Sequence, residues 1–461
     1  MERHQLWGGR FQVAPNAALV ELNESLSVDF RLWPYDIRSA KAWVAAIAQA
    51  GVLDAAEESR LSKGLDRVAT RLERGDGDNA TDEDVHTLVE RLLYEEVGDV
   101  AGKLNTGRSR NDQVTTDLRL WCLDAIAAVD SELQALGNAL VSQASSGVDT
   151  VMPGYTHGQR AQPVTWAYVM LAHAWPLARD RGRLADAADR LAESPLGLAA
   201  LAGSGIAVDR EQIARELGLK RLSQNGLDAT GARDFVAELL FVLGIVATHV
   251  SRLAGELFTY ASAEYGFVRL SEAYCTGSSL LPQKRNPDVL ELARAKASRI
   301  LGDLAGMLSL ERGLPAGYNK DLQEDKSLLF DAVDTTLLTL PAIRGAIEEM
   351  KPVADRMEMA LDHTMLATDL ADQLVAGGVT FREAHGLVGN LVRVAESLSV
   401  PLTDIPAETA STIHPEFPTL IGSLGTWRDS IERRSTMGGA SKQSVERQIE
   451  LLTQQFAADP T

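Results

Sequence analysis

The sequence has few cysteines, few aromatic residues and no long apolar run. Its two cysteines, Cys122 and Cys275, are too few for a disulfide framework and show no zinc-ligand spacing. Aromatic residues make up 5% of the chain, which disfavours a large β-sheet core. The longest apolar run, residues 239–247, is too short to span a bilayer, and the N-terminus lacks a signal-peptide pattern. These absences predict a reduced, cytoplasmic protein.

Positive charge is also in deficit. The 461 residues carry a formal net charge of -19, with 64 acidic and 45 basic side chains. Such an acidic surface disfavours nucleic acids, whose binding depends on neutralising phosphates, and anionic membranes. A small anionic substrate remains compatible, because a local group of cations can oppose the overall field.

Apolar residues recur with helical rather than strand spacing. The three clearest series follow Gln113, Thr230 and Pro287: Leu118, Cys122, Ala125, Val129, Leu133, Leu136 and Leu140; Phe235, Leu239, Val242, Val246, Val250, Leu253, Leu257 and Tyr260; Val289, Leu292, Ile300, Leu304 and Leu308. Together they predict an all-α fold with a bundle of long helices, and an oligomer that buries a second apolar stripe. We expect an N-terminal helical domain at 1–109, the long bundle at 110–358 and a C-terminal helical domain at 359–461.

The C-terminal domain contains the pattern DLADQLVAGGVTFREAHGLVGNLV, residues 369–392. It predicts two helices joined by a Gly-Gly turn, which is compatible with a DNA-binding helix-turn-helix or with an ordinary helical hairpin. The second helix region offers only Arg382 and Arg393 as cations, so the hairpin is favoured.

Three polar segments interrupt the helical pattern. The first, KLNTGRSRNDQ at 103–113, precedes a long helix. Asn111 or Asp112 could simply cap that helix. Alternatively, Arg108, Ser109, Arg110 and the helix N-terminus could bind a carboxylate.

The second segment, MPGYTHGQRAQP at 152–163, is a predicted loop that contains His157. A lone histidine is more often structural than catalytic, but the glycine- and proline-rich setting favours a functional role here. Pro163 is predicted to lie in the first turn of the next helix.

The third segment is TGSSLLPQKRNPDVLE at 276–291, without the P-loop or GxSxG patterns. Glycine and prolines could make it a plain loop. In a functional interpretation, Lys284, Arg285 and Asn286 direct donors at an oxyanion. Glu291 follows about one turn into the next helix, where a carboxylate could orient a histidine. A serine can act as a base once nearby cations lower its pKa, and this loop supplies them. Proton abstraction beside a carboxylate, followed by loss of a leaving group, fits these groups.

The third segment resembles GSSxMPxKxNP, the mobile loop of the aspartase/fumarase superfamily. LWGGRF (6–11), KLNTGRSRNDQ, GYTHGQRAQP (154–163) and YNKDLQEDK (318–326) further resemble segments of the argininosuccinate lyase family, in the same order. Three positions depart from the family pattern: Leu281 replaces Met, Gly158 replaces Leu and Asn105 replaces His.

The resemblance implies an all-helical homotetramer with a twenty-helix core, five long helices from each subunit, and active sites shared by three subunits. It implies that Ser278 on the mobile loop and His157 are the acid/base pair, and that Glu291 raises the basicity of His157. Lys284 and Asn286 would hold the carboxylate that gathers charge. Eight further residues would bind the rest of the substrate: Ser25, Ser109, Arg110, Asn111, Thr156, Tyr318, Gln323 and Lys326. The resemblance leaves open whether serine or histidine takes the first proton, and the cationic loop favours Ser278.

The expected activity is the reversible elimination of fumarate from argininosuccinate to give L-arginine, the last step of arginine biosynthesis, without cofactor or metal. An alternative is adenylosuccinate lyase or another fumarate-releasing lyase, because the KRNP sequence around Arg285 is also familiar from adenylosuccinate lyases. A second alternative is an inactive structural protein like the δ-crystallins. An inactive relative would be expected to have lost loop or histidine residues, and His157, Ser278, Lys284 and Glu291 are all present.

Overall fold

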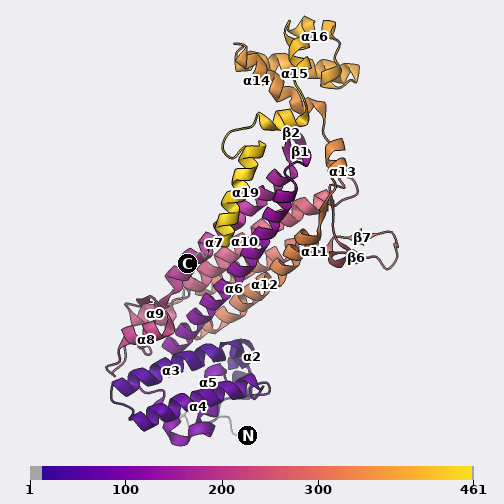
Figure 1. The fold of residues 1–461 in the computed structure, drawn as a ribbon. Helices are drawn as coiled ribbons and strands as arrows, with labels where there is room; N and C mark the ends of the chain where they lie inside the picture. The colour runs from indigo at the N-terminus through magenta and orange to yellow at the C-terminus, as the bar shows by residue number, and fades with distance from the viewer. Residues whose placement is uncertain (1–12, 459–461) are drawn as a thin grey trace. The chain divides into compact units, whose positions relative to one another are not determined.

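Helices make up nearly all the regular structure in a computed structural model that describes residues 13–458 (Figure 1). The predicted all-α fold class is therefore confirmed. The segment LWGGRF at 6–11, one of those that carry the family resemblance, lies outside the described residues.

The chain folds as two compact units, each built from three segments. The first comprises Met1–Asp130, Gly182–Ile245 and Ser298–Leu337; the second comprises Ser131–Arg181, Val246–Ala297 and Leu338–Thr461. The three domains expected with boundaries after residues 109 and 358 stay a prediction.

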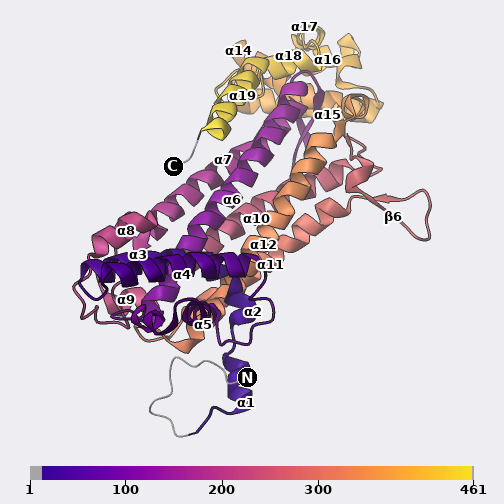
Figure 2. The ribbon, with the colours of Figure 1, turned by 60° about the horizontal axis from the view of Figure 1, so that its bottom comes forward.

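The N-terminal part of the first unit is a set of short and medium helices, of which α3, α4 and α5 pack on one another (Figures 1 and 2). They are α1 (Ala17–Asn23), α2 (Leu26–Asp29), η1 (Phe30–Leu32), α3 (Trp33–Gln49), α4 (Ala55–Glu73), α5 (Val85–Val97) and η2 (Gly98–Lys103). Side chains start two of them: Asp54 and Glu57 form a capping box on α4, and Asp84 caps α5 by accepting from Thr87 N.

Five helices of the described residues have 24 residues or more, and each contributes residues to both units. They are α6 (Arg110–Ser146), α7 (Trp166–Leu191), α10 (Asp234–Tyr260), α11 (Asp288–Glu311) and α12 (Asp325–Glu349). Every residue of the apolar series predicted for α6 and α10 is buried. The series predicted for α11 is not: Leu292 and Leu308 are 56% and 54% exposed in the single chain.

Short elements connect the long helices. They are β3 (Glu193–Ser194), α8 (Arg210–Leu217), β4 (Arg221–Leu222), α9 (Gly226–Gly231), β5 (Val268–Arg269), η3 (Glu272–Tyr274) and η4 (Lys320–Glu324). Strand β8 (Lys351–Pro352) follows α12 and pairs with β5. Helix α10 is apolar and long enough to cross a membrane, with a mean hydropathy of 1.7 in its most apolar window. Because 61% of that window is buried in the fold, α10 is a core helix.

The segment around His157 is a β-hairpin and not the loop expected from the sequence. Strands β1 (Val151–Thr156) and β2 (Gln159–Thr165) pair antiparallel, and His157 lies at the tip with a φ of 54°. The expected position of Pro163 in a helix was wrong, because Pro163 pairs with Pro153 in this hairpin and α7 begins three residues later. A two-stranded ribbon has only edges, and edge strands tolerate proline.

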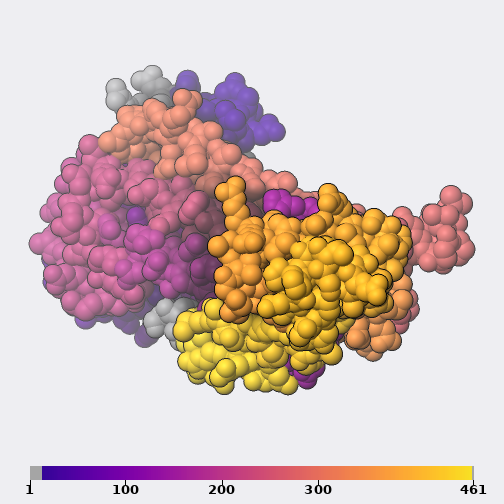
Figure 3. Space-filling model, turned by 90° about the horizontal axis from the view of Figure 1, so that it is seen from above, coloured from indigo at the N-terminus to yellow at the C-terminus, as the bar shows by residue number. Residues whose placement is uncertain are grey.

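The serine-containing segment is a loop, as predicted. Its stem is a short antiparallel pair, β6 (Thr276–Gly277) with β7 (Arg285–Asn286), and α11 starts two residues later. The loop extends away from α11 (Figure 2), and the space-filling view shows it projecting from its surroundings (Figure 3).

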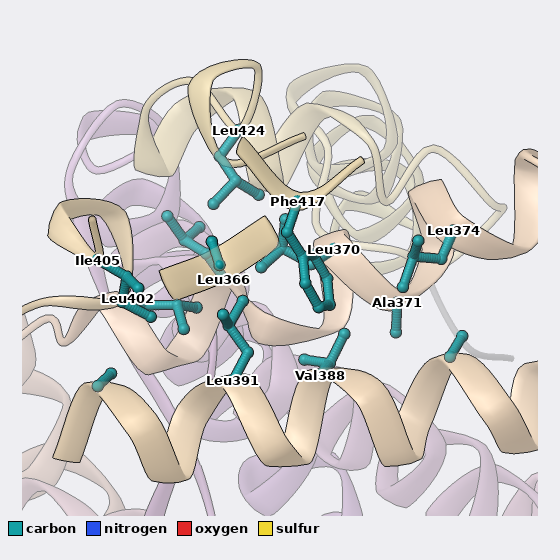
Figure 4. Packing of buried hydrophobic residues seen from close by; sticks show 13 residues of the cluster. Leu366, Leu370, Ala371, Leu374, Val388, Leu391, Leu402, Ile405, Phe417 and Leu424 are labelled. Carbon is teal, nitrogen blue, oxygen red and sulfur yellow. The ribbon is translucent and has the colours of Figure 1, made fainter. Parts of the chain in front are cut away.

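The C-terminal part of the second unit has a hydrophobic core of its own. Its helices are α13 (Ala354–Met359), η5 (His363–Leu366), α14 (Ala367–Ala376), α15 (Phe381–Leu398), η6 (Leu402–Asp404), α16 (Ala407–Ile413), α17 (Phe417–Gly422), α18 (Trp427–Glu432) and α19 (Lys442–Ala457). Leu370 on α14, Leu391 on α15 and Phe417 on α17 meet in this core (Figure 4). The predicted helix–turn–helix pattern is thus a packed helical hairpin, turning at Gly378 with a φ of 98°.

Two glycines inside helices allow a paired test of the packing of α6 against α19. A Cβ at Gly137 on α6 would overlap the Phe456 ring on α19, whereas a Cβ at Gly386 on α15 would meet nothing within 4 Å. We expect Gly386→Ala to stabilise the protein by about 1 kcal/mol through helix propensity. Gly137→Ala should destabilise it by about 1–3 kcal/mol through overpacking. Chemical denaturation measures both, and equal effects of the same sign would contradict this packing.

Candidate active site

Ser109 and Asn111 lie at the start of α6, where they join that helix to the segment 197–200. Ser109 N donates to Asp112 Oδ1 (3.0 Å), and Asp112 Oδ2 accepts from Gly197 N and Ala199 N (3.0 and 2.7 Å). Asn111 Nδ2 donates to Ala200 O (3.1 Å). Burial raises the pKa of Asp112 to about 6. Because α6 begins at Arg110, Asn111 and Asp112 lie in its first turn and not at the predicted cap position.

Arg110 is held by the N-terminal cap of α5. Its Nη1 donates to the Asp84 carboxylate and to Thr87 Oγ1 (3.1 Å). Burial alone would raise the pKa of Asp84, but Arg110 and His86 outweigh it, so that pKa lies below its ordinary value. An ionised Asp84 therefore fixes one side of the Arg110 guanidinium.

Ser25 reaches the same turn of α5. Its Oγ donates to Asp29 Oδ2 (2.7 Å), and Asp29 Oδ1 accepts from Val85 N (2.9 Å). Burial raises the pKa of Asp29 to about 6. Ser25 and Arg110, 85 positions apart in the chain, thus depend on one helix N-terminus.

Lys326 belongs to a buried ionic triad. Lys326 Nζ contacts Asp325 Oδ1 (2.8 Å), and Arg233 Nε donates to the other carboxylate oxygen. The side chains of Lys326, Asp325 and Arg233 are 4%, 0% and 0% exposed. Burial would raise the pKa of Asp325, but its two cationic partners hold it below its ordinary value. Just before the triad, Gln323 Nε2 donates to Asn23 O (3.4 Å).

Tyr318 interacts electrostatically with both the Arg110 group and the Lys326 group. Burial raises the pKa of its hydroxyl to about 12, and the charges of Arg233, Asp325, Asp84 and Arg110 act on it as well. Among the predicted residues of the first unit, Tyr318 is thus linked by charge to the Arg110 and Lys326 groups, and Ser25 reaches the Arg110 group through Asp29. Ser109 and Asn111 adjoin Arg110 in the chain, and Gln323 contacts Asn23.

The remaining predicted residues belong to the second unit. Thr156 and His157 are exposed at the hairpin tip, and Lys284 is exposed on the loop. Asn286 is half-buried in β7, and Glu291 is exposed in the first turn of α11. Among the described residues, no hydrogen bond or ion pair joins His157, Ser278 and Glu291 to one another.

Ser278 is half-buried, and its oxygen faces backbone donors. Ser278 Oγ accepts from Leu280 N (3.3 Å) and Leu281 N (3.0 Å). Lys284 N donates to Leu281 O (3.0 Å), which closes a turn directly after the residues whose amides contact Ser278. Two N–H donors directed at one hydroxyl oxygen favour negative charge on that oxygen.

Two family models match this chain. One, described as "Lyase", matches residues 9–302, and another, described as "Argininosuccinate lyase C-terminal", matches residues 364–432. The argininosuccinate lyase of Roseiflexus sp. (strain RS-1) is 51% identical over 445 residues, covering 96% of this chain and 98% of that protein. That of Schizosaccharomyces pombe is 42% identical over 447 residues, covering 97% of each. The chain belongs to the argininosuccinate lyase family.

A solved structure supports the fold of this lyase. An EDDS lyase variant with bound fumarate superposes with a TM-score of 0.82 at 26% identity, covering 92% of this chain and 86% of that one. The family resemblance predicted from the sequence motifs is therefore confirmed.

The sequence interpretation missed the carboxylates that hold the cations of this lyase. Asp84 and Asp325 are buried partners of Arg110 and Lys326, and Arg233 completes the second group. A signal was available only for Asp325, which adjoins Lys326 in the run QEDK (323–326) and was therefore a candidate counterion. Asp84 lies 26 positions from Arg110, and no sequence pattern connects the two.

The triad allows a stability prediction. Asp325→Asn would leave Arg233 and Lys326 buried without a counterion, so it should cost about 3–5 kcal/mol. The ionised form of Asp325 supports folding above its ordinary pKa of 3.8, so the full effect is expected at pH 7. Asp331→Asn on the same helix, where Asp331 pairs with a 58% exposed Arg299, should change stability by less than about 1 kcal/mol. Urea titrations at equal protein concentration compare them, and equal losses would contradict the role of the triad.

Proposed function

We propose that this lyase eliminates fumarate from argininosuccinate and releases L-arginine. A base removes a proton from the carbon beside a succinyl carboxylate, and the C–N bond to the guanidinium group then breaks. The electrons of that bond leave with nitrogen, which takes a proton from an acid. No water or redox partner is consumed. The observation that carries this proposal is the similarity to argininosuccinate lyases along nearly the whole chain, including the C-terminal family model.

Ser278 is the base in this proposal. A serine hydroxyl is a poor base unless its conjugate alkoxide is stabilised. The Leu280 and Leu281 amides already donate to its oxygen, and Lys284 follows in the same loop. After proton removal, negative charge spreads onto the neighbouring carboxylate, where Lys284 and Asn286 serve as donors.

His157 is the acid that protonates the leaving nitrogen, and Glu291 orients and supports it. His157 projects from the tip of a rigid hairpin, and Glu291 projects from the first turn of α11. Thr156 adjoins the histidine as a further substrate contact.

The first unit supplies the anchors. Argininosuccinate carries three carboxylates and one guanidinium group, so it requires several cations and at least one acceptor. Arg110 and Lys326 provide the cations, and Ser25, Ser109, Asn111, Tyr318 and Gln323 provide neutral polar groups around them. Because their partners are fixed, these anchors are pre-organised and bind with little loss of conformational entropy.

Homotetramer formation would complete this site with segments from three subunits. Large apolar side chains remain exposed on three long helices of the single chain: Phe241 on α10 (52%), Leu292, Leu301 and Leu308 on α11 (56%, 45% and 54%), and Leu338 on α12 (64%). Such residues are expected to pack against other subunits. His157 and Ser278 would then meet from different copies, in a soluble cytoplasmic enzyme.

The purified protein should release fumarate from argininosuccinate but not from adenylosuccinate, as followed by fumarate absorbance. Ser278→Ala should lower kcat by about 10²–10⁴-fold and leave substrate affinity nearly intact, because the anchors lie on other segments. Ser279→Ala is the control, since this exposed neighbour serves no proposed role. Near-full kcat in Ser278→Ala would exclude it as the base, and activity only on adenylosuccinate would overturn the substrate assignment.

Mixing inactive variants tests the shared site. His157→Asn and Ser278→Ala, denatured and refolded together, should recover part of the activity, because some mixed tetramers contain sites with both native residues. Each variant refolded alone is the control. A fully active monomer in sedimentation experiments would contradict the proposal.

A further inference from the structure

A buried group of ionisable side chains adjoins the Arg110 anchor, and the proposed reaction does not use it. Asp36 on α3, His86 on α5 and Asp117 on α6 are 1%, 4% and 0% exposed. One ligand-type atom from each lies within 4.8 Å of the others. Burying three ionisable side chains costs free energy of desolvation, so a function that their interactions serve is expected.

The contacts join three helices. His86 Nδ1 lies 3.2 Å from Asp36 Oδ2 and 3.7 Å from Asp117 Oδ2. Asp36 Oδ1 accepts from Gln113 Nε2 on α6 (2.6 Å). Asp36 therefore links α3 to both α5 and α6, and His86 Nε2 and both Asp117 oxygens are left without hydrogen-bond partners among the described residues.

The charges explain how the group tolerates burial. Burial alone would lower the pKa of His86, but Asp36 and neighbouring carboxylates outweigh it, so that pKa is raised and the imidazolium pairs with Asp36. Burial and the nearby Asp36 charge raise the pKa of Asp117 to about 8, which favours its neutral form. A charged Asp117 beside Asp36 would be repelled, which is consistent with its neutral form.

The position of His86 connects this group to the anchor. Asp84, which holds Arg110, caps α5 only two residues before His86. Fixing the His86 side chain against α3 and α6 fixes the first turn of α5 and hence the direction of the Asp84 carboxylate. Arg110, with a 30% exposed side chain, depends on that carboxylate for its only ion pair within residues 13–458.

We propose that Asp36 is a positioning residue that acts through His86 and Asp84 to direct Arg110 at a substrate carboxylate. This inference rests on the anchoring role of Arg110 in the proposed function. Asp117 contributes as the neutral neighbour that allows the charged Asp36–His86 pair to stay buried. A loss of orientation of about 1 Å at a binding group can cost about 10²-fold.

Asp36→Asn tests the inference in the full-length enzyme. It keeps the shape of the side chain but removes the charge that pairs with His86. We expect kcat/KM for argininosuccinate to fall about 10–100-fold, mainly through a higher KM, because a binding group and not the proton-transfer pair is misdirected. Asp36→Asn added to Arg110→Ala should cause little further loss, because both act through the same guanidinium.

Asp180→Asn is the matched control. Asp180 is likewise 0% exposed, and its Oδ2 lies 2.7 Å from His249 Nδ1 in the second unit. This substitution also removes a buried carboxylate from a histidine, so it controls for lost stability. Its effect on kcat/KM, if any, should be the same with and without Arg110.

Gln113→Leu provides a second variant if Asp36→Asn does not fold. It removes only the hydrogen bond to Asp36 Oδ1 and should raise KM in the same way, by a smaller factor. An unchanged KM in Arg110→Ala would overturn the proposed anchor and this inference with it. A raised KM in Arg110→Ala with additive effects of Asp36→Asn would overturn this inference alone. So would one tightly bound metal ion per chain in the purified enzyme that is lost in Asp36→Asn, because the three side chains would then be ligands.

Discussion

The pairing of buried cations with buried carboxylates is the constraint on which the first unit depends. Asp325 is the buried counterion of Arg233 and Lys326, without which two charges would be buried unpaired, and Asp84 is the counterion of the partly buried Arg110. Two of these pairs join segments that are distant in sequence: Arg110 with Asp84, and Arg233 with Asp325. Charge compensation therefore joins the start of α6 to the start of α5, and the start of α12 to the residue that precedes α10.

The second unit differs from the first, because several of the side chains proposed to take part in the reaction are exposed in it. His157 and Lys284 face solvent, and the loop also exposes Leu280 (81%) and Leu281 (42%). The exposure of two leucines next to Ser278, the proposed base, costs free energy that burial would recover, at about 25 cal/mol per Å² of apolar surface. A loop of this composition is suited to close over a ligand or against another subunit, which would exclude water from the reaction.

The positions of α6, α10 and α11 could be predicted from the sequence, and for α6 and α10 so could their buried faces. The α6 and α10 series were correct because period-3.6 spacing reports one buried face. The α11 series contains exposed Leu292 and Leu308, since spacing alone does not say which surface covers an apolar stripe. The β1–β2 hairpin was missed because paired prolines such as Pro153 and Pro163 argue against strands.

The site residues stay a prediction, but the contacts of those residues in the structure can be compared with what the sequence indicated. Motifs gave the cations and hydroxyls, such as Arg110 and Ser278, but not their partners. Whether Asp325 holds Lys326 depends on tertiary packing, which adjacency in the sequence does not determine. The same holds for the amides of Leu280 and Leu281, whose direction towards Ser278 follows from the backbone of one turn.

The pairing of Arg110 and Lys326 with carboxylates also influences how a protein with a net charge of -19 could bind an anionic substrate. Asp84 offsets the charge of Arg110, and Asp325 offsets one of the two charges of Arg233 and Lys326, so the two groups together keep one net positive charge. The N–H groups of Arg110 and Lys326 that do not contact Asp84 or Asp325 can still donate to a ligand. Their directions are fixed by the carboxylate partners. Such donors act mainly at hydrogen-bond distance, where charge-assisted bonds are strong. In the proposed site, recognition depends on the fit of carboxylates to fixed donors, and any change that frees Arg110 should weaken binding even though its charge is kept.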